Sequence, residues 1–288
     1  MLAMNSDPLP NVSSTYERIC EDEDVENCVK PFLPVNNSRQ FKDMKTHNIM
    51  MCTIPKTGST LLYAINCLLN DELGFFYNKK KIFGDFNAND CFNNARWTME
   101  DAAEVHGPEV YDWTKLTVVR DPIDRFLSAF VFACIKGYET PNECKYECNG
   151  CGSNFTCFVE REYDMLMRFN RGRYGASFLL QHTWPQNWWC DMSKYRHNTT
   201  IIKHDTDPNI FIPRLINFFE SKNISAQALN YIKDITMNQR THHATVSTRA
   251  RQFFEDRLRS SPYLMDKVVR MFYHDFKVFG FSLPPGYQ

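Results

Sequence analysis

Two apolar runs along the chain each end at a polar turn and are followed by apolar residues at helical spacing. The first run covers residues 49–54, and the helical spacing after it covers 61–69. The second run covers 116–119, and the helical spacing after it covers 126–131. Short uncharged runs of this kind are typical of strands buried on both faces of a parallel sheet. The pattern therefore predicts two strand–turn–helix units of an α/β domain.

The turn after the first run has the composition of an anion-binding loop. Its six residues are Pro55, Lys56, Thr57, Gly58, Ser59 and Thr60. Backbone N–H groups at the start of the following helix favour an anion, and Gly58 lets the main chain approach a ligand closely. Lys56 adds a positive charge, and the three hydroxyl groups add donors. An ordinary strand-to-helix turn that contains a glycine is the alternative, because short glycine motifs also occur by chance.

The order of these residues narrows the class of phosphate ligand that the loop could bind. In the Walker A loop of nucleotide triphosphatases a lysine follows the second glycine. Here Lys56 precedes Gly58, and no glycine lies earlier in the turn. The order predicts a phosphate-binding loop of a different kind and argues against a P-loop kinase that uses ATP and Mg²⁺.

The turn after the second run also carries phosphate-binding side chains. Asp121 is a favourable N-cap and Pro122 a favourable first helical residue, so a helix is expected to begin here. Arg120 then lies at the end of the strand, and Ser128 lies about two turns into the helix. A guanidinium and a hydroxyl in this arrangement suit one phosphate group. The alternative is an arginine paired with Asp124 and a serine packed inside the helix.

Together, PKTGST at 55–60 and RDPIDRFLSAF at 120–130 resemble the two cofactor motifs of the sulfotransferase family that uses 3′-phosphoadenosine 5′-phosphosulfate (PAPS). The first is similar to the 5′-phosphosulfate loop of that family. The second is similar to its 3′-phosphate motif, with Arg120 and Ser128 at the matching positions. More narrowly, the chain resembles the Golgi carbohydrate sulfotransferases that act on chondroitin and related glycans, in which a cysteine often stands three residues before the proline of the loop, as Cys52 does here.

Two later segments extend this resemblance to roughly residues 49–281. The family has a His-Trp pair followed by a cysteine and a tyrosine ahead of a strand. Here His182 and Trp184 are separated by one inserted threonine, and Cys190 and Tyr195 follow. The segment 272–281 is similar to the closing segment of the family.

The resemblance implies a three-layer, P-loop-like α/β sulfotransferase fold with a central parallel sheet and PAPS at the carboxyl ends of its strands. Residues 1–45 are expected to form a polar stem, and 46–288 a single domain with a Cys-rich insertion at 134–157. The implied activity is transfer of a sulfo group from PAPS to a glycosaminoglycan hydroxyl, namely O-4 of N-acetylgalactosamine in chondroitin. Another glycan or position, such as dermatan or a uronic acid 2-O or 3-O, is an alternative. A non-catalytic protein that binds glycan or nucleotide with the same fold is another.

The chemistry requires a cation near the leaving phosphate and a base near the attacking hydroxyl. Lys56 suits the first role, and no metal is expected. For the base, the resemblance offers His106, upstream of the second motif, and His182; Glu104 is a third candidate. We rank His106 slightly above His182, and for each candidate a structural or surface role is the alternative.

The charge and cysteine content refine this picture. A net charge of −1 excludes a general polyanion-binding or nucleic-acid-binding surface, so an acidic glycan requires a local basic cleft. Eleven cysteines favour an oxidising compartment. The spacing of Cys144, Cys148 and Cys151 permits zinc, but we expect disulfides there instead. Cys52 and Cys67, on the first strand and its helix, are expected to be buried and unpaired.

Glycosylation sequons point to the same compartment. Five asparagines open an N-x-[ST] motif: Asn11, Asn36, Asn154, Asn198 and Asn223. The resemblance implies the Golgi lumen or membrane and an N-terminal membrane anchor. No segment of this chain approaches the ~20 apolar residues of a membrane span, so the anchor expected from the family is absent from this sequence. The oligomeric state is left open.

Overall fold

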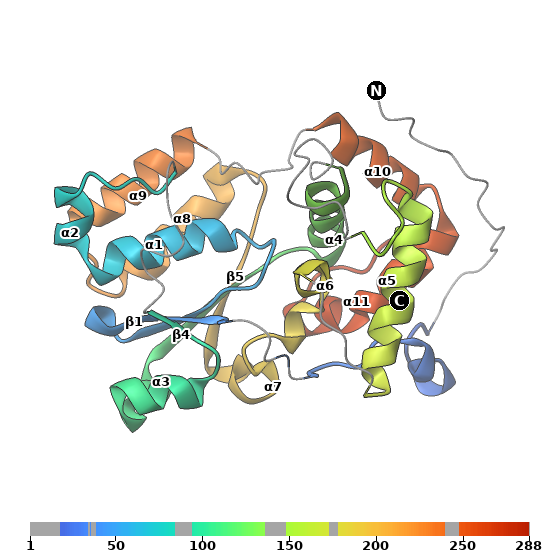
Figure 1. Ribbon diagram of the computed structural model, residues 1–288, viewed down its shortest axis with the longest axis horizontal. Helices are drawn as coiled ribbons and strands as arrows, with labels where there is room; N and C mark the ends of the chain where they lie inside the picture. Colours follow the sequence, from blue (N-terminus) through green and yellow to red (C-terminus); the bar gives the residue numbers. More distant parts are fainter. Residues whose placement is uncertain are drawn as a thin grey trace. The chain divides into compact units, whose positions relative to one another are not determined.

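The computed structural model describes residues 18–33, 35, 39–83, 94–135, 148–172, 178–239 and 248–287 (Figure 1). The chain divides into two compact units. The sheet unit comprises Pro34–Arg120 and Trp189–Ala244, and the helical unit comprises Met1–Leu33, Asp121–Trp188 and Thr245–Gln288.

The sheet unit is built on a mixed, mostly parallel sheet of five strands in the order β3-β1-β2-β4-β5. The strands are β1 (Phe41–Met44), β2 (Ile49–Cys52), β3 (Ala95–Arg96), β4 (Thr114–Val119) and β5 (Thr199–Lys203). β2, β4 and β5 run parallel, while β1 pairs antiparallel with β2 and β3. The two predicted strands are confirmed as β2 and β4, and the predicted α/β class is confirmed with them. β1 lies inside the predicted stem 1–45, so packed structure begins before residue 46.

Helices cover both faces of this sheet (Figure 1). They are α1 (Ser59–Asn70), α2 (Glu72–Tyr77), α3 (Met99–His106), α7 (Met192–Tyr195), α8 (Pro208–Glu220) and α9 (Ala226–Asn238). The apolar sides of α1 and α8 pack on β2 and β4 in one buried cluster, in which Leu62, Leu116 and Leu215 are fully buried. This cluster fixes α1, and with it the turn that precedes α1, against the centre of the sheet.

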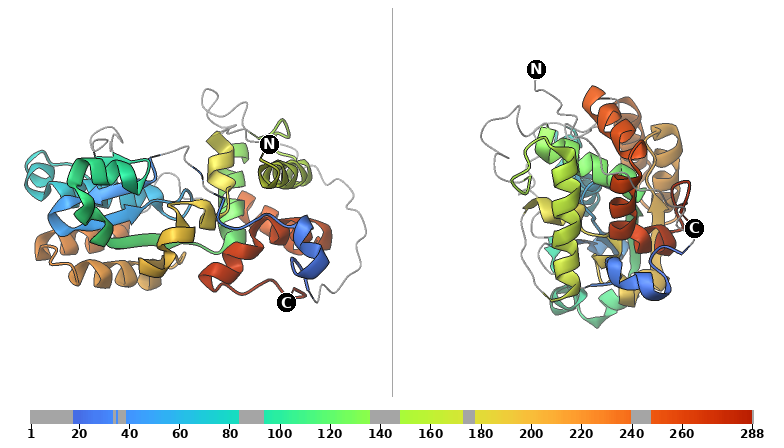
Figure 2. Two further views of the ribbon diagram at one scale, coloured as in Figure 1. Left: turned by 90° about the horizontal axis from the view of Figure 1, so that it is seen from below. Right: turned by 90° about the vertical axis from the view of Figure 1, so that its right-hand side faces the viewer.

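The helical unit contains α4 (Pro122–Phe130), α5 (Phe155–Asn170), α6 (Phe178–Thr183), α10 (Arg249–Arg259) and α11 (Pro262–Phe279). α5 packs against α11 (Figure 2). Aromatic side chains from several helices meet in its core, where the Phe126 ring lies 5.5 Å from that of Phe158 and 5.6 Å from that of Phe272. As predicted, α4 begins with Pro122, and the Asp121 carboxylate accepts a hydrogen bond from the Asp124 N–H at 2.9 Å.

The cysteines form disulfides, as predicted in preference to zinc. The bonds join Cys20 to Cys28, Cys52 to Cys190, Cys134 to Cys148 and Cys151 to Cys157. Cys144 lies outside the described residues. The prediction that Cys52 and Cys67 are unpaired is wrong, because both are disulfide-bonded. The partner of Cys52 is 138 residues away, and a local sequence pattern carries no information on such a pairing.

The described sequons differ in exposure. Asn198 and Asn223 are exposed, whereas Asn154 is half-buried and its side-chain oxygen caps α5 by accepting from the Cys157 N–H at 3.0 Å. Asn11 and Asn36 lie outside the described residues. Among the helices that the structure describes, none is both long and apolar enough to cross a membrane.

Candidate active site

The turn between β2 and α1 is a short loop with two residues in the left-handed region of backbone conformation. Lys56 has a φ of 66° and Gly58 a φ of 91°, a backbone conformation that favours glycine at position 58. Thr57 is fully buried, and its hydroxyl donates to the Ile54 carbonyl at 2.8 Å. That hydroxyl therefore closes the turn, instead of serving the ligand as the sequence predicted.

The start of α1 carries no side-chain cap. Gly58 is its N-cap residue, and no acidic residue lies in the first turn. In the described part of the chain, every other helix of eight or more residues has a side chain that accepts from its first turn. The first N–H groups of a helix need acceptors, so the start of α1 suits an anionic ligand.

Arg120 joins this loop at the same edge of the sheet. β2 and β4 are parallel neighbours, with Cys52 opposite Thr117, so the residue after β4 reaches the turn after β2. Arg120 is 6% exposed, and its guanidinium donates from Nη1 to the Lys56 carbonyl at 3.2 Å. The two turns predicted to grip one nucleotide thus meet at the carboxyl ends of adjacent strands.

Gln40 holds the beginning of the loop. Its carbonyl accepts from the Thr53 N–H at 2.9 Å and the Thr53 hydroxyl at 3.2 Å. Its side-chain oxygen accepts from the Cys190 N–H at 2.8 Å. Since Cys190 is also bonded to Cys52, a covalent and a hydrogen-bonded link fix the chain on either side of the β2 terminus. Such support keeps a binding loop in one geometry.

A third strand end brings His204 to the loop. His204 follows β5, and its N–H donates to the Val119 carbonyl at 2.7 Å. The imidazole packs on the Phe211 ring at 4.7 Å between centroids, and its Cδ2 lies 3.6 Å from where a β-carbon on Gly58 would stand. His204 belongs to no motif recognised in the sequence. Its position as the first residue past an apolar strand was the available signal, since ligands bind at the carboxyl ends of parallel strands.

Ser128, the other half of the predicted phosphate pair, lies on α4 in the helical unit and is 3% exposed. Asp124, the alternative partner for Arg120, forms an ion pair with Arg251 of α10. The loop belongs to the sheet unit, so the participation of Ser128 in a phosphate site stays a prediction.

The position of His106 does not support a catalytic role. Its Nε2 lies 3.0 Å from a carboxylate oxygen of Asp43, which also pairs with Arg96 at 2.9 Å. Its ring lies 5.0 Å from that of Trp113, the residue immediately before β4. His106 therefore lies toward the amino ends of the strands, while the loop lies at their carboxyl ends. Glu104 is exposed on the same helix, α3.

His182, the second candidate base, is the penultimate residue of α6 in the helical unit, and its ring stacks on that of Phe132 with 6.1 Å between centroids. The chain that follows it is held by three buried ionisable side chains. Glu162 accepts from the Thr183 hydroxyl, and Arg125 donates to the Trp184 carbonyl at 2.8 Å.

The third of these side chains is Asp275, which accepts from the N–H groups of Gln186 at 2.7 Å and Asn187 at 2.8 Å. Burial raises the pKa of Asp275, and burial raises the pKa of Glu162 to about 7. The segment after His182 is thus rigidly placed, and the role of His182 as base stays a prediction.

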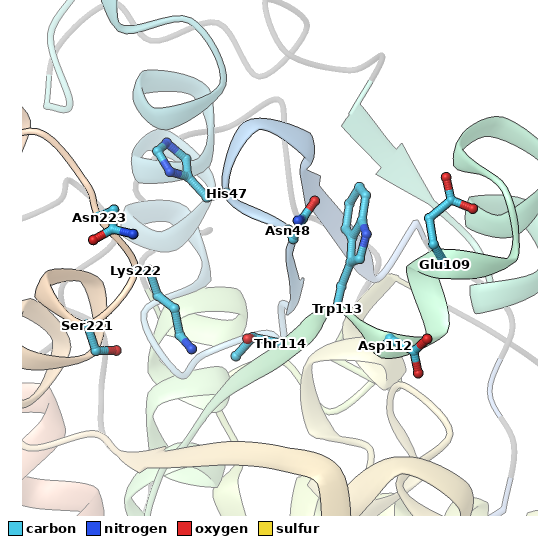
Figure 3. Close-up of a pocket in the computed structure, with 9 residues that line it drawn as sticks. All are labelled: His47, Asn48, Glu109, Asp112, Trp113, Thr114, Ser221, Lys222 and Asn223. Carbon is cyan, nitrogen blue, oxygen red and sulfur yellow. The ribbon is translucent and has the colours of Figure 1, made fainter.

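A separate pocket opens at the other edge of the sheet (Figure 3). Its lining includes Asn48 and Thr114, which lie at the amino ends of β2 and β4. Trp113 lies between Asn48 on one side and the carboxylates of Glu109 and Asp112 on the other. Lys222 and Asn223 line the opposite wall. Because this pocket lies at the amino ends of the parallel strands, it is distinct from the site at the loop.

An uncapped helix start, a lysine-bearing loop and an arginine at the end of the neighbouring strand form an arrangement that suits a phosphorylated ligand in an α/β domain. The chain belongs to the sulfotransferase family, whose model matches residues 39–282. It is 27% identical over 288 residues to the carbohydrate sulfotransferase chst-1 of Caenorhabditis elegans, and the aligned region covers 94% of this chain and 84% of that protein.

Two further relatives come from the same species. An uncharacterized protein is 32% identical over 294 residues, covering 99% of this chain and 80% of that protein. The putative sulfotransferase vep-2 is 28% identical over 240 residues, covering 80% of this chain and 74% of that protein. No solved structure matches the chain.

Proposed function

We propose that this sulfotransferase uses PAPS as donor and a glycosaminoglycan hydroxyl as acceptor. The observation that carries the donor assignment is the contact between Arg120 and the Lys56 carbonyl at the uncapped start of α1. Two cationic side chains and a set of N–H groups at one edge of the sheet suit a ligand with more than one phosphate group.

In the proposed reaction an acceptor hydroxyl attacks the sulfur of PAPS. The new oxygen–sulfur bond forms as the bond between sulfur and the bridging phosphate oxygen breaks, and 3′-phosphoadenosine 5′-phosphate (PAP) leaves. Lys56 stabilises the negative charge that develops on the bridging oxygen. A base removes the hydroxyl proton, and of the predicted candidates we assign this role to His182. Arg120 binds a phosphate group of the nucleotide, with Ser128 as its proposed partner.

For the acceptor we propose O-4 of N-acetylgalactosamine in chondroitin. Support comes from the motif resemblance and from the name of the relative chst-1, a carbohydrate sulfotransferase. We further propose that the protein works in the Golgi lumen, where disulfides persist. Four described disulfides support an oxidising compartment. A membrane anchor is part of this proposal through the family alone.

The test is incubation of the purified protein with labelled PAPS and a panel of desulfated glycans, followed by disaccharide analysis of the products. We expect label at O-4 of N-acetylgalactosamine in chondroitin, and none after Lys56→Ala. The control is Lys233→Ala, since Lys233 is an exposed cation on α9 of the same unit. Failure of the wild-type protein to bind PAP would overturn the donor assignment. Tight PAP binding without transfer to any glycan would identify a non-catalytic binding protein instead.

A further inference from the structure

A second pair of cations lies beside the loop, on the side away from Arg120. Lys42 is on β1, and its Nζ donates to the Arg39 carbonyl at 2.5 Å. The same ammonium lies 4.9 Å from the centre of the Tyr63 ring on α1. Burial, together with the positive charge of Arg39, lowers the pKa of Lys42 to about 8.

The sheet register places this pair next to the donor loop. Lys42 is opposite Met51 on β2, one residue before the strand ends. Gln40, which directly follows Arg39, accepts through its carbonyl from the N–H of Thr53, where the loop begins. The pair therefore lies at the carboxyl end of β2, as the loop does.

The strand order separates this pair from the groups that hold the donor. β1 and β4 lie on opposite sides of β2, and Arg120 approaches the loop from β4. Lys42 belongs to β1, and Arg39 lies two residues before that strand. A nucleotide bound by the loop and Arg120 extends toward β4, which leaves the β1 side of the loop for the molecule that receives the sulfo group.

Two neighbouring positive charges beside a binding loop cost free energy, because like charges repel and a partly buried ammonium loses hydration. An anion between them removes both costs. The Tyr63 ring under the ammonium stabilises the charged form and offers an apolar face to a sugar ring. This combination suits an acidic sugar better than a bare inorganic anion.

We propose that Arg39 and Lys42 bind the carboxylate of a uronic acid residue in the acceptor chain, next to the sugar that is sulfated. This assignment rests on the proposed function, because it takes the acceptor to be an acidic glycan. It gives the protein a local basic site for a polyanion despite its net charge of −1.

The test compares Lys42→Met and Arg39→Gln with the wild-type protein on unsulfated chondroitin and on carboxyl-reduced chondroitin. Lys42→Met keeps an apolar stem over Tyr63 and removes the charge, while Lys42→Arg restores a cation. The matched control is Lys45→Met, an exposed lysine just past the other end of β1. Thermal unfolding of each variant checks that the fold is retained.

We expect Lys42→Met and Arg39→Gln each to raise the KM for chondroitin about tenfold, the loss of one charge-assisted contact. We expect kcat and PAP affinity to stay unchanged, Lys42→Arg to recover most of the loss, and Lys45→Met to match the wild type. On carboxyl-reduced chondroitin the wild type should be as weak as the variants. An unchanged KM would overturn the proposal. A weaker affinity for PAP, or an equal loss on both acceptors, would also overturn it.

Calorimetric binding of a chondroitin oligosaccharide to the PAP-bound protein separates this proposal from the proposed function. Binding that depends on Arg39 and Lys42 without any sulfo transfer would support the subsite and overturn the catalytic assignment. Transfer to chondroitin that is indifferent to both substitutions would do the reverse.

Discussion

The disulfide between Cys52 and Cys190 is expected to contribute more stability than the three short-range disulfides that the structure describes. The perturbation is the double substitution Cys52→Ala and Cys190→Ala, which removes the bond without burying a new polar group. The bonded residues are 138 apart in sequence. Cross-linking two residues lowers the entropy of the unfolded chain by an amount that grows with the logarithm of the loop length. For this loop the bond adds about 5 kcal/mol to the unfolding free energy, and the double substitution removes it. Shorter bonds within the loop reduce that figure.

The Cys151–Cys157 bond is the matched control, because its residues are only 6 apart. The same relation gives about 2 kcal/mol for it. The assay is guanidinium unfolding without reductant, followed by fluorescence and circular dichroism so that separate transitions of the two units are seen. We expect the Cys52/Cys190 variant to lose more than the Cys151/Cys157 variant, in the transition of the sheet unit. Equal losses in the two variants would refute the reasoning from loop length.

Binding adds a second readout. Cys52 is the last residue of β2. Gln40 binds the Cys190 N–H through its side chain and the Thr53 N–H through its main-chain carbonyl. Without the bond the loop is less ordered, so we expect weaker PAP binding in the Cys52/Cys190 variant and no change in the Cys151/Cys157 variant. Unchanged PAP affinity in both would show that the hydrogen bonds of Gln40 suffice to order the loop.

Three further predictions concern single side chains. Arg120→Ala should weaken PAP binding by about 1.5–3 kcal/mol in calorimetry, the value of a charge-assisted contact, and an affinity equal to wild type would exclude Arg120 from the site. Burial raises the pKa of Glu162 in the folded protein to about 7, from an ordinary value of 4.5. Between these two pH values the folded state binds more protons than the unfolded state, so the unfolding free energy of the wild type falls as pH rises, by about 3 kcal/mol in total. Glu162→Gln should remove that slope in denaturant titrations at pH 5 and pH 8, and parallel wild-type and variant curves would contradict it. His182→Ala should lower kcat about 10²- to 10⁴-fold while His106→Ala lowers stability and leaves kcat near wild type; the opposite pattern would make His106 the base.

The helices and strands that have a distinctive local hydrophobic pattern could be predicted from the sequence. The strands at 49–54 and 116–119 and the helices after them could be predicted because burial of both sheet faces requires uncharged runs and a buried helix face requires a period of 3.6. The start of α4 was predictable from Asp121 and Pro122. β1 could not be predicted in this way. It is only four residues long and contains Lys42 and Asp43, so it has no distinctive apolar run.

The candidate site divides in the same way. Lys56 and Arg120 were found because each stands in a recognisable turn. His204, Arg39 and Lys42 lie near the loop only through strand pairing, which no local motif reports. His106 was selected by its place along the chain, yet its partner Asp43 lies 63 residues away across the sheet. Long-range pairing therefore set the limit of sequence reasoning here.

The bare start of α1 has a practical consequence for work on this protein. A helix end that awaits an acceptor does not discriminate strongly among tetrahedral oxyanions. We therefore expect inorganic phosphate or sulfate in a buffer to compete with the proposed nucleotide and to raise its apparent dissociation constant. Affinities should accordingly be measured in chloride-based media, and titration with sulfate offers a simple inhibitor for mapping the site.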